Sequence, residues 1–168
     1  VTSTAKFLQR YSLFVDITGT GTVSLSPAPV SGASSCATDC TVYYGNTDVV
    51  TLTASSSGAW DFISFGGAIS CAGSPTVCSW SAPAGNASAT ALFRQRTTLT
   101  LAITGKGSVT ADKVSLTELQ GAGTSKTVCN AALANGAVCT FTSYAGTSVS
   151  LTATADSTYR FGAWGGDC

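Results

Sequence analysis

One sequence unit occurs twice in this chain, and the repeat constrains the fold more than any other feature. The stretch TAKFLQRYSLFVDITGTG, which begins at Thr4, aligns without a gap with TALFRQRTTLTLAITGKG, which begins at Thr90. The alignment resumes between CTVYYGNTDVVTLTA from Cys40 and CTFTSYAGTSVSLTA from Cys139. Because each copy of a sequence repeat folds as one structural unit, we predict a tandem array of one small module.

The aligned copies set the expected domain boundaries. Residues 1–8 match the end of the first copy, so we expect them to be the closing strand of an upstream repeat. Residues 9–95 are expected to form repeat module 1, and residues 96–168 an incomplete repeat module 2. Module 2 lacks a match to residues 72–93, so we interpret the chain as part of a longer tandem array of repeats. The alternative is head-to-tail strand donation between chains, which would build a filament.

Both copies open with a stretch in which mostly apolar residues occupy every second position. Residues 11–18 and 97–104 alternate in this way, which is the period of a half-buried strand. A G-x-G motif follows at Gly19 and at Gly105, and glycine supplies the positive φ of a tight hairpin. No long stretch shows helical periodicity. The expected fold class is therefore all-β, with two tandem small disulfide-pinned β-rich modules, the second truncated at its C-terminus.

The seven cysteines favour disulfides over zinc ligation. Zinc sites favour C-x2-C knuckles or mixed Cys/His sets, whereas this chain has wider local spacings and no histidine. The repeat suggests that each cysteine bonds to its neighbour, although six cysteines allow many connectivities. The expected disulfides are Cys36–Cys40, Cys71–Cys78 and Cys129–Cys139, with Cys168 bonded to a partner outside the chain. Disulfides predict an oxidising compartment, extracellular or at the cell surface.

Composition argues against two classes of partner. Charged residues make up 10% of the chain and the formal net charge is zero, so we expect no nucleic-acid partner. No apolar run approaches the ~18 residues of a membrane-spanning helix, so we expect no membrane span. A surface of such low charge repels other copies only weakly, which favours association between copies.

The acidic residues give no candidate for catalysis. Asp16 and Asp61 align with Ala102 and Arg160 in the second copy, and such exchanges are typical of solvated surface. The chain also lacks histidine, a nucleophile elbow, a P-loop and a calcium loop. We therefore expect no enzyme activity, no catalytic residue, no metal site and no cofactor.

Large aromatic rings recur in register in the two copies. Phe62 aligns with Phe161, and Phe65 aligns with Trp164, each before a Gly-Gly pair. Because the unit is otherwise rich in Thr, Ser and Gly, we expect these rings to supply the apolar area of the core. A sugar-stacking platform is the alternative interpretation.

Three aromatic residues are candidates for an interaction surface. Phe14 and Trp80 fall on the outward side of their expected strands. Tyr43 and Tyr44 are adjacent, so one of them must point outward, and Tyr44 is our candidate. The stretch 108–138 is expected to be a longer loop in the second copy, and it is a further candidate for binding.

The order of these motifs resembles a known family. The carrying stretches are ITGTGTVSLSP, VVTLTASSSGAWDFISFGGAISC and ASATALF in the first copy, and ITGKGSV and VSLTATADSTYRFGAWGGDC in the second. The pattern is similar to the divergent internalin-type B-repeat family, a bacterial repeat domain. The resemblance implies small β-rich modules in tandem on large secreted or cell-surface bacterial proteins, with no catalytic residues. Phe65 departs from the family's usual Trp before Gly-Gly.

The sequence and the resemblance lead to one function hypothesis and one alternative. The hypothesis is a non-catalytic extracellular structural repeat module, acting as a stalk, spacer or filament-forming subunit of a bacterial surface or secreted protein. Its partners would be other copies of itself or neighbouring repeats. The alternative is an adhesive or glycan-binding module, which would bind a glycan or a host cell surface through exposed aromatics and the 108–138 loop.

Overall fold

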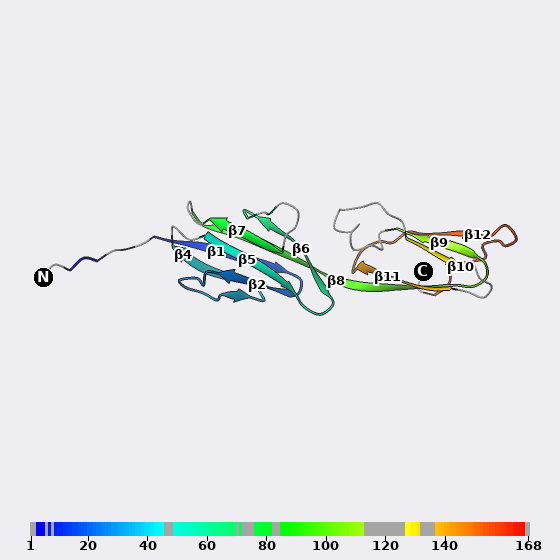
Figure 1. The fold of residues 1–168 in the computed structure, drawn as a ribbon, viewed down its shortest axis with the longest axis horizontal. Helices are drawn as coiled ribbons and strands as arrows, with labels where there is room; N and C mark the ends of the chain where they lie inside the picture. Colours follow the sequence, from blue (N-terminus) through cyan, green and yellow to red (C-terminus); the bar gives the residue numbers. More distant parts are fainter. Residues whose placement is uncertain are drawn as a thin grey trace. The chain divides into compact units, whose positions relative to one another are not determined.

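A computed structural model of the chain contains two compact units, Val1–Gln95 (unit 1) and Arg96–Cys168 (unit 2) (Figure 1). The structure describes residues 3–5, 7, 9–45, 49–69, 71, 76–81, 85–112, 127–131 and 137–166. Every regular element in these residues is a β-strand, so the expected all-β fold class is confirmed. The division falls within β8 (Ala87–Ile103), whose first part belongs to unit 1 and whose second part belongs to unit 2.

Unit 1 is built from two β-sheets. Its strands besides β8 are β1 (Arg10–Thr18), β2 (Gly21–Ser26), β3 (Ser35–Cys36), β4 (Cys40–Gly45), β5 (Val49–Ser56), β6 (Trp60–Gly67) and β7 (Val77–Ser81). The first sheet runs β6–β8–β1–β4, with β8 parallel to β1 and antiparallel to β6. The second sheet runs β3–β2–β5–β7, and all its pairs are antiparallel.

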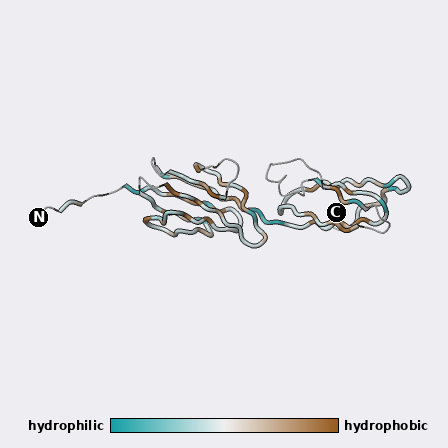
Figure 2. Tube along the Cα trace, viewed as in Figure 1, coloured by the Kyte–Doolittle hydropathy of each residue, from teal (hydrophilic) through white to brown (hydrophobic). Residues whose placement is uncertain are grey.

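The core of unit 1 combines residues from both sheets, because alternate residues of each strand face inward. Leu13 and Val15 of β1 are fully buried in the same cluster as Leu52 of β5. Figure 2 shows the hydrophobic positions, drawn in brown, concentrated along the strands. Unit 1 is therefore a β-sandwich, the architecture that half-buried alternating strands favour.

The described residues of unit 2 contain fewer strands, in a similar arrangement. They are the second part of β8 together with β9 (Gly107–Ala111), β10 (Thr127–Ala131), β11 (Ala137–Tyr144) and β12 (Leu151–Ala155). β11 pairs with β8, and the other sheet has the order β10–β9–β12. The buried cluster of unit 2 comprises Leu101, Val109, Ala111, Cys129 and Phe141.

Aligned residues of the two units pair in the same register. The matching Cα partners are Val15–Cys40 and Leu101–Cys139, Val23–Ala54 and Val109–Ala153, and Val23–Cys36 and Val109–Cys129. A slip of one residue in any of these pairs would turn the apolar residues of a strand away from the core. The sequence repeat is therefore accompanied by a repeat of strand pairing.

The stretch 108–138 is not one long loop, and this expectation is wrong. It includes residues of β9, the whole of β10 and the start of β11. The unit has a strand at β10 because Cys129 pairs with Val109, as Cys36 pairs with Val23 in unit 1. Residues 113–126 and 132–136 lie outside the described residues.

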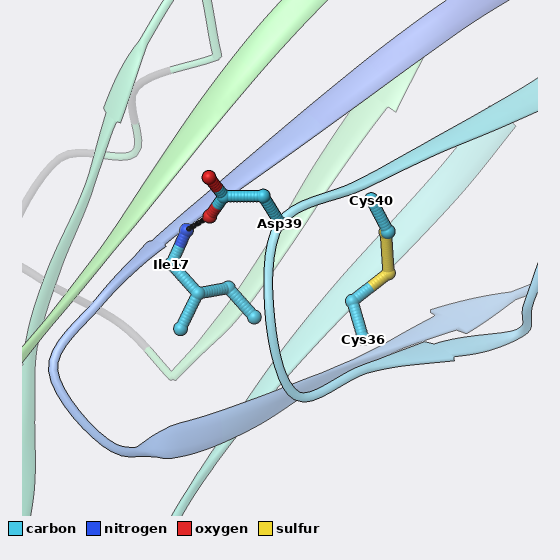
Figure 3. The surroundings of a disulfide bond; sticks show 4 residues. All are labelled: Ile17, Cys36, Asp39 and Cys40. Carbon is cyan, nitrogen blue, oxygen red and sulfur yellow. Dashed lines mark hydrogen bonds between the residues drawn. A yellow bond between two sulfur atoms is a disulfide. The ribbon is translucent and has the colours of Figure 1, made fainter.

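Two of the three disulfides among the described residues join strands of the two sheets of one unit, and the third joins the segment after β6 to β7. The bonds are Cys36–Cys40 between β3 and β4 (Figure 3), Cys71–Cys78 between the segment after β6 and β7, and Cys129–Cys139 between β10 and β11. Their Cα separations are 6.0, 5.9 and 5.9 Å. These are the three pairs that the repeat suggested. Cys168 lies outside the described residues.

The Cys36–Cys40 loop also holds a carboxylate against β1. Asp39 accepts a hydrogen bond through its Oδ1 atom from the backbone N–H of Ile17, at 2.9 Å (Figure 3). The equivalent residue in unit 2 is Val138, whose side chain cannot accept a hydrogen bond. This contact is therefore a feature of unit 1 alone.

Candidate interaction surfaces

Tyr44 is fully buried, so its expected place in an interaction surface is wrong. Its hydroxyl donates a hydrogen bond to the carbonyl oxygen of Pro27 at 3.1 Å. Val42 and Tyr44 are two residues apart on β4 and share its inward face, so Tyr43 points outward and is exposed. The alternation with Val42 is the sequence signal that identifies Tyr43 as the surface residue.

Trp80 also faces the core, contrary to expectation. It lies opposite Val50 of β5 and two residues from Cys78, and both of these residues are buried. The Trp80 side chain is half-buried and packs against the core of unit 1. The disulfide of Cys78 fixes the inward face of β7, and Trp80 shares that face.

Phe14 is exposed, and it shares a sheet face with Tyr43. Phe14 lies opposite Thr41 in the β1–β4 pair, and Tyr43 is two residues from Thr41. The equivalent residues in unit 2 are Thr100 and Thr142. Because threonine stands at both positions in the second copy, the repeat does not need aromatic rings there to fold.

The aromatic residues before Gly-Gly are buried in unit 1 and exposed in unit 2. Phe62 and Phe65 belong to β6 and lie in the core. Their equivalents Phe161 and Trp164 are 48% and 41% exposed, and residues 159–166 form no strand. The expectation that these rings are core residues therefore holds for unit 1 and is wrong for unit 2.

The difference arises from the strand that covers the rings of unit 1. The first part of β8 pairs with β6 on one side and with β1 on the other. Its inward residues Ala89, Ala91 and Phe93 are buried, and the Phe93 ring lies edge-on to Phe62 with centroids 5.5 Å apart. The described residues of unit 2 include no equivalent of this strand.

Unit 2 has a groove at the position that β8 fills in unit 1. The groove has a volume of about 880 Å³ and is lined by residues 98–104 of β8 and by residues 160–166. Val109 of β9 and Ala153 of β12 also line it. The two lining segments are equivalent to β1 and β6 of unit 1, which pair with the two edges of β8. We call this feature the unit 2 groove.

The described lining of the unit 2 groove consists mainly of apolar, glycine and threonine residues. Among the described residues, its charged lining side chains are those of Lys106 and Arg160. Over the described ranges, no group of three potential metal ligands comes together. A helix long and apolar enough to cross a membrane is likewise not found in that part of the chain.

The repeated strand register and the disulfides define a disulfide-linked β-repeat domain. Comparison with protein families adds one match. The family model of the divergent InlB B-repeat domain matches residues 97–168. This match agrees, over these residues, with the bacterial repeat family that the motif order suggested. Searches among curated proteins and solved structures find no match.

Proposed function

We propose that the chain is a non-catalytic structural part of an extracellular bacterial protein, either secreted or held at the cell surface. It consists of repeat module 1 at 9–95 and repeat module 2 at 96–168, and it acts as a stalk, a spacer or a filament-forming subunit. The family match at residues 97–168 and the repeated register of both units support this assignment.

The observation that carries the proposal is the placement of the disulfides between sheets. Two sheets of a sandwich are otherwise held together by side-chain packing, which is weak against a pulling force. A covalent bond at the start of β4, and another near the start of β11, prevents the sheets from separating there. Such bonds persist in an oxidising compartment, which agrees with an extracellular location.

Several observations also support a role without catalysis. The described residues show no group of potential metal ligands, and those that line the groove of unit 2 include no carboxylate. Asp16 of unit 1 accepts a hydrogen bond from the Thr90 hydroxyl at 3.3 Å, so it acts as a structural acceptor. Its equivalent in unit 2 is Ala102, which cannot serve as an acid or a base.

Single-molecule force spectroscopy tests the structural role. The chain is pulled from its two ends before and after reduction of the disulfides. We expect both units of the oxidised chain to resist unfolding at forces that the reduced chain does not withstand. Equal unfolding forces in the two states would contradict the proposed function.

The second candidate function is adhesion through Phe14 and Tyr43, which are exposed on one face of unit 1. The observation that favours it is the replacement of both rings by threonine in unit 2, which frees them from a folding role. A glycan array with the oxidised chain tests this candidate. Binding that is lost in Phe14→Ala and Tyr43→Ala, but kept in the control Val77→Ala on the other sheet, would support adhesion.

A further inference from the structure

We propose that the strand pair β1–β8 carries the tension in unit 1, and that a pull along the chain shears this pair instead of unzipping it. This inference rests on the proposed function, because a stalk or spacer transmits force, and it specifies which backbone contacts of unit 1 bear that force. Tension reaches unit 1 at residues 10 and 95, whatever chain lies outside them.

The first support is the direction of the two strands through which tension enters and leaves unit 1. β1 begins at Arg10, and β8 leaves unit 1 after Gln95. The two strands are parallel neighbours with six Cα partner pairs. Because they are parallel, the start of β1 and the end of the unit 1 part of β8 lie at opposite ends of the pair. Tension therefore pulls the two strands past each other along their length.

The direction of pulling decides how the hydrogen bonds between two strands are loaded. The backbone hydrogen bonds of a parallel pair are evenly spaced, so a shearing force is shared among all of them. In an antiparallel hairpin both chain ends lie at the same end of the pair, and tension breaks its hydrogen bonds one after another. The β1–β8 pair should therefore withstand more tension than a hairpin of the same length.

The second support is the place of the pair within its sheet. On its other edge β1 pairs with β4 across six Cα partners, and β8 pairs with β6 across seven. The sheet thus has two halves, β4–β1 and β8–β6, and the β1–β8 pair joins them. Because each strand is held straight by its second partner, shear at the junction acts on all six pairs at once.

The third support is a set of side-chain hydrogen bonds that link the two strands. The Thr90 hydroxyl of β8 donates to the Oδ2 atom of Asp16 on β1 at 3.3 Å. Asn86, directly before β8, accepts a hydrogen bond through its Oδ1 atom from the backbone N–H of Ser12 at 3.1 Å. These contacts add to the backbone ladder at two levels along the pair.

The inner face of the pair is closed to water. Leu13 and Val15 of β1 and Ala89 and Ala91 of β8 are fully buried in the core of unit 1. Val15 and Ala89 are direct partners in the parallel register. Water that could replace a stretched backbone hydrogen bond is therefore excluded from one side of the pair, which strengthens the ladder against a pull.

Pulling unit 1 in two directions tests the proposal in the full oxidised chain. In the shear direction the handles are attached at Gln9 and Thr97, two exposed positions that flank unit 1. In the control direction they are attached at Gln9 and Ser88, which is exposed and lies opposite Phe14, near the start of β1. Bio-orthogonal amino acids at these positions carry the handles, so the native cysteines stay paired. We expect a severalfold higher unfolding force in the shear direction.

A pair of matched variants tests which contacts bear the force. Thr90→Val removes the hydroxyl that donates to Asp16 and should lower the unfolding force in the shear direction. Thr53→Val makes the same chemical change at a half-buried position of β5, in the other sheet, and should leave that force unchanged. A force that stays the same in Thr90→Val, or falls equally in both variants, would contradict the role of the β1–β8 pair.

Equal unfolding forces in the two pulling directions, or a higher force in the control direction, would overturn the proposal. The proposed function is tested separately, by comparing oxidised and reduced chains. A dependence on direction without a dependence on reduction would leave the β1–β8 pair as the site of resistance and reject the role of the disulfides. The converse result would reject the role of the β1–β8 pair alone.

Discussion

At the scale of single residues, the same sequence position has different surroundings in the two units. Phe62 is buried under β8, whereas its equivalent Phe161 is about half exposed. The two residues have the same side chain, and in each copy a glycine pair begins four residues further on. Their environments differ because burial of this ring depends on a strand far away in the sequence.

The first prediction compares these two positions. Phe62→Ala should lower the free energy of unfolding of unit 1 by about 3–5 kcal/mol, the usual cost of removing a buried phenylalanine. Phe161→Ala should cost about 1 kcal/mol or less in dilute solution, because half of the ring is already in water. Urea denaturation of both variants measures the difference, and equal costs would contradict an open groove in unit 2.

The second prediction concerns the hydrogen bond from Ile17 to Asp39. Asp39→Ala removes the acceptor for this backbone N–H and should destabilise unit 1 by about 1 kcal/mol. Asp39→Asn is the matched control, because it keeps a carbonyl oxygen at the same position and should cost less. The midpoint of urea unfolding measures the stability of both variants. If the Asp39→Ala variant were as stable as the parent chain, the predicted contribution of this hydrogen bond would be wrong.

At the scale of elements, alternation and repeat alignment predicted much of the structure. The strands expected at 11–18 and 97–104 match β1 and the second part of β8, and the local cysteine pairs match the disulfides. What failed was the assignment of faces. Whether a residue such as Trp80 points inward depends on the face fixed by its neighbour Cys78, and that information comes from the partner sheet.

The open groove could not be predicted from local patterns either. The motif before Gly-Gly has aromatic residues at the same three positions in both copies, and it indicated a core in each. The rings of unit 1 are buried because β8 pairs with β6 across residues far apart in the chain.

The third prediction concerns the disulfides as links between sheets. Removing the Cys129–Cys139 bond by serine substitution should destabilise unit 2 by about 3 kcal/mol. Removing the Cys36–Cys40 bond should destabilise unit 1 by about 2 kcal/mol. The first effect is larger because a disulfide that closes a longer loop removes more entropy from the unfolded chain. Hydrogen exchange read separately for peptides of each unit measures both effects. Destabilisation of the wrong unit would contradict the assignment of each bond to a single unit.

At the scale of the whole molecule, the two units share a strand register and differ in the surroundings of one aromatic pair. In unit 1, β8 pairs with β6, and Phe62 and Phe65 are buried. In unit 2, the exposed rings Phe161 and Trp164 line the unit 2 groove. The chain carries few charges and no formal net charge, so electrostatic repulsion opposes association between copies only weakly.

Hydrogen–deuterium exchange tests this account most directly, because it compares the equivalent stretches 60–67 and 161–166 in one experiment. We predict that amides at 60–67 are protected, since β6 pairs with β8 within unit 1. Amides at 161–166 should exchange quickly, since these residues form no strand. If 161–166 were as protected as 60–67, the account of one aromatic pair buried beside β8 and an exposed equivalent in unit 2 would be wrong.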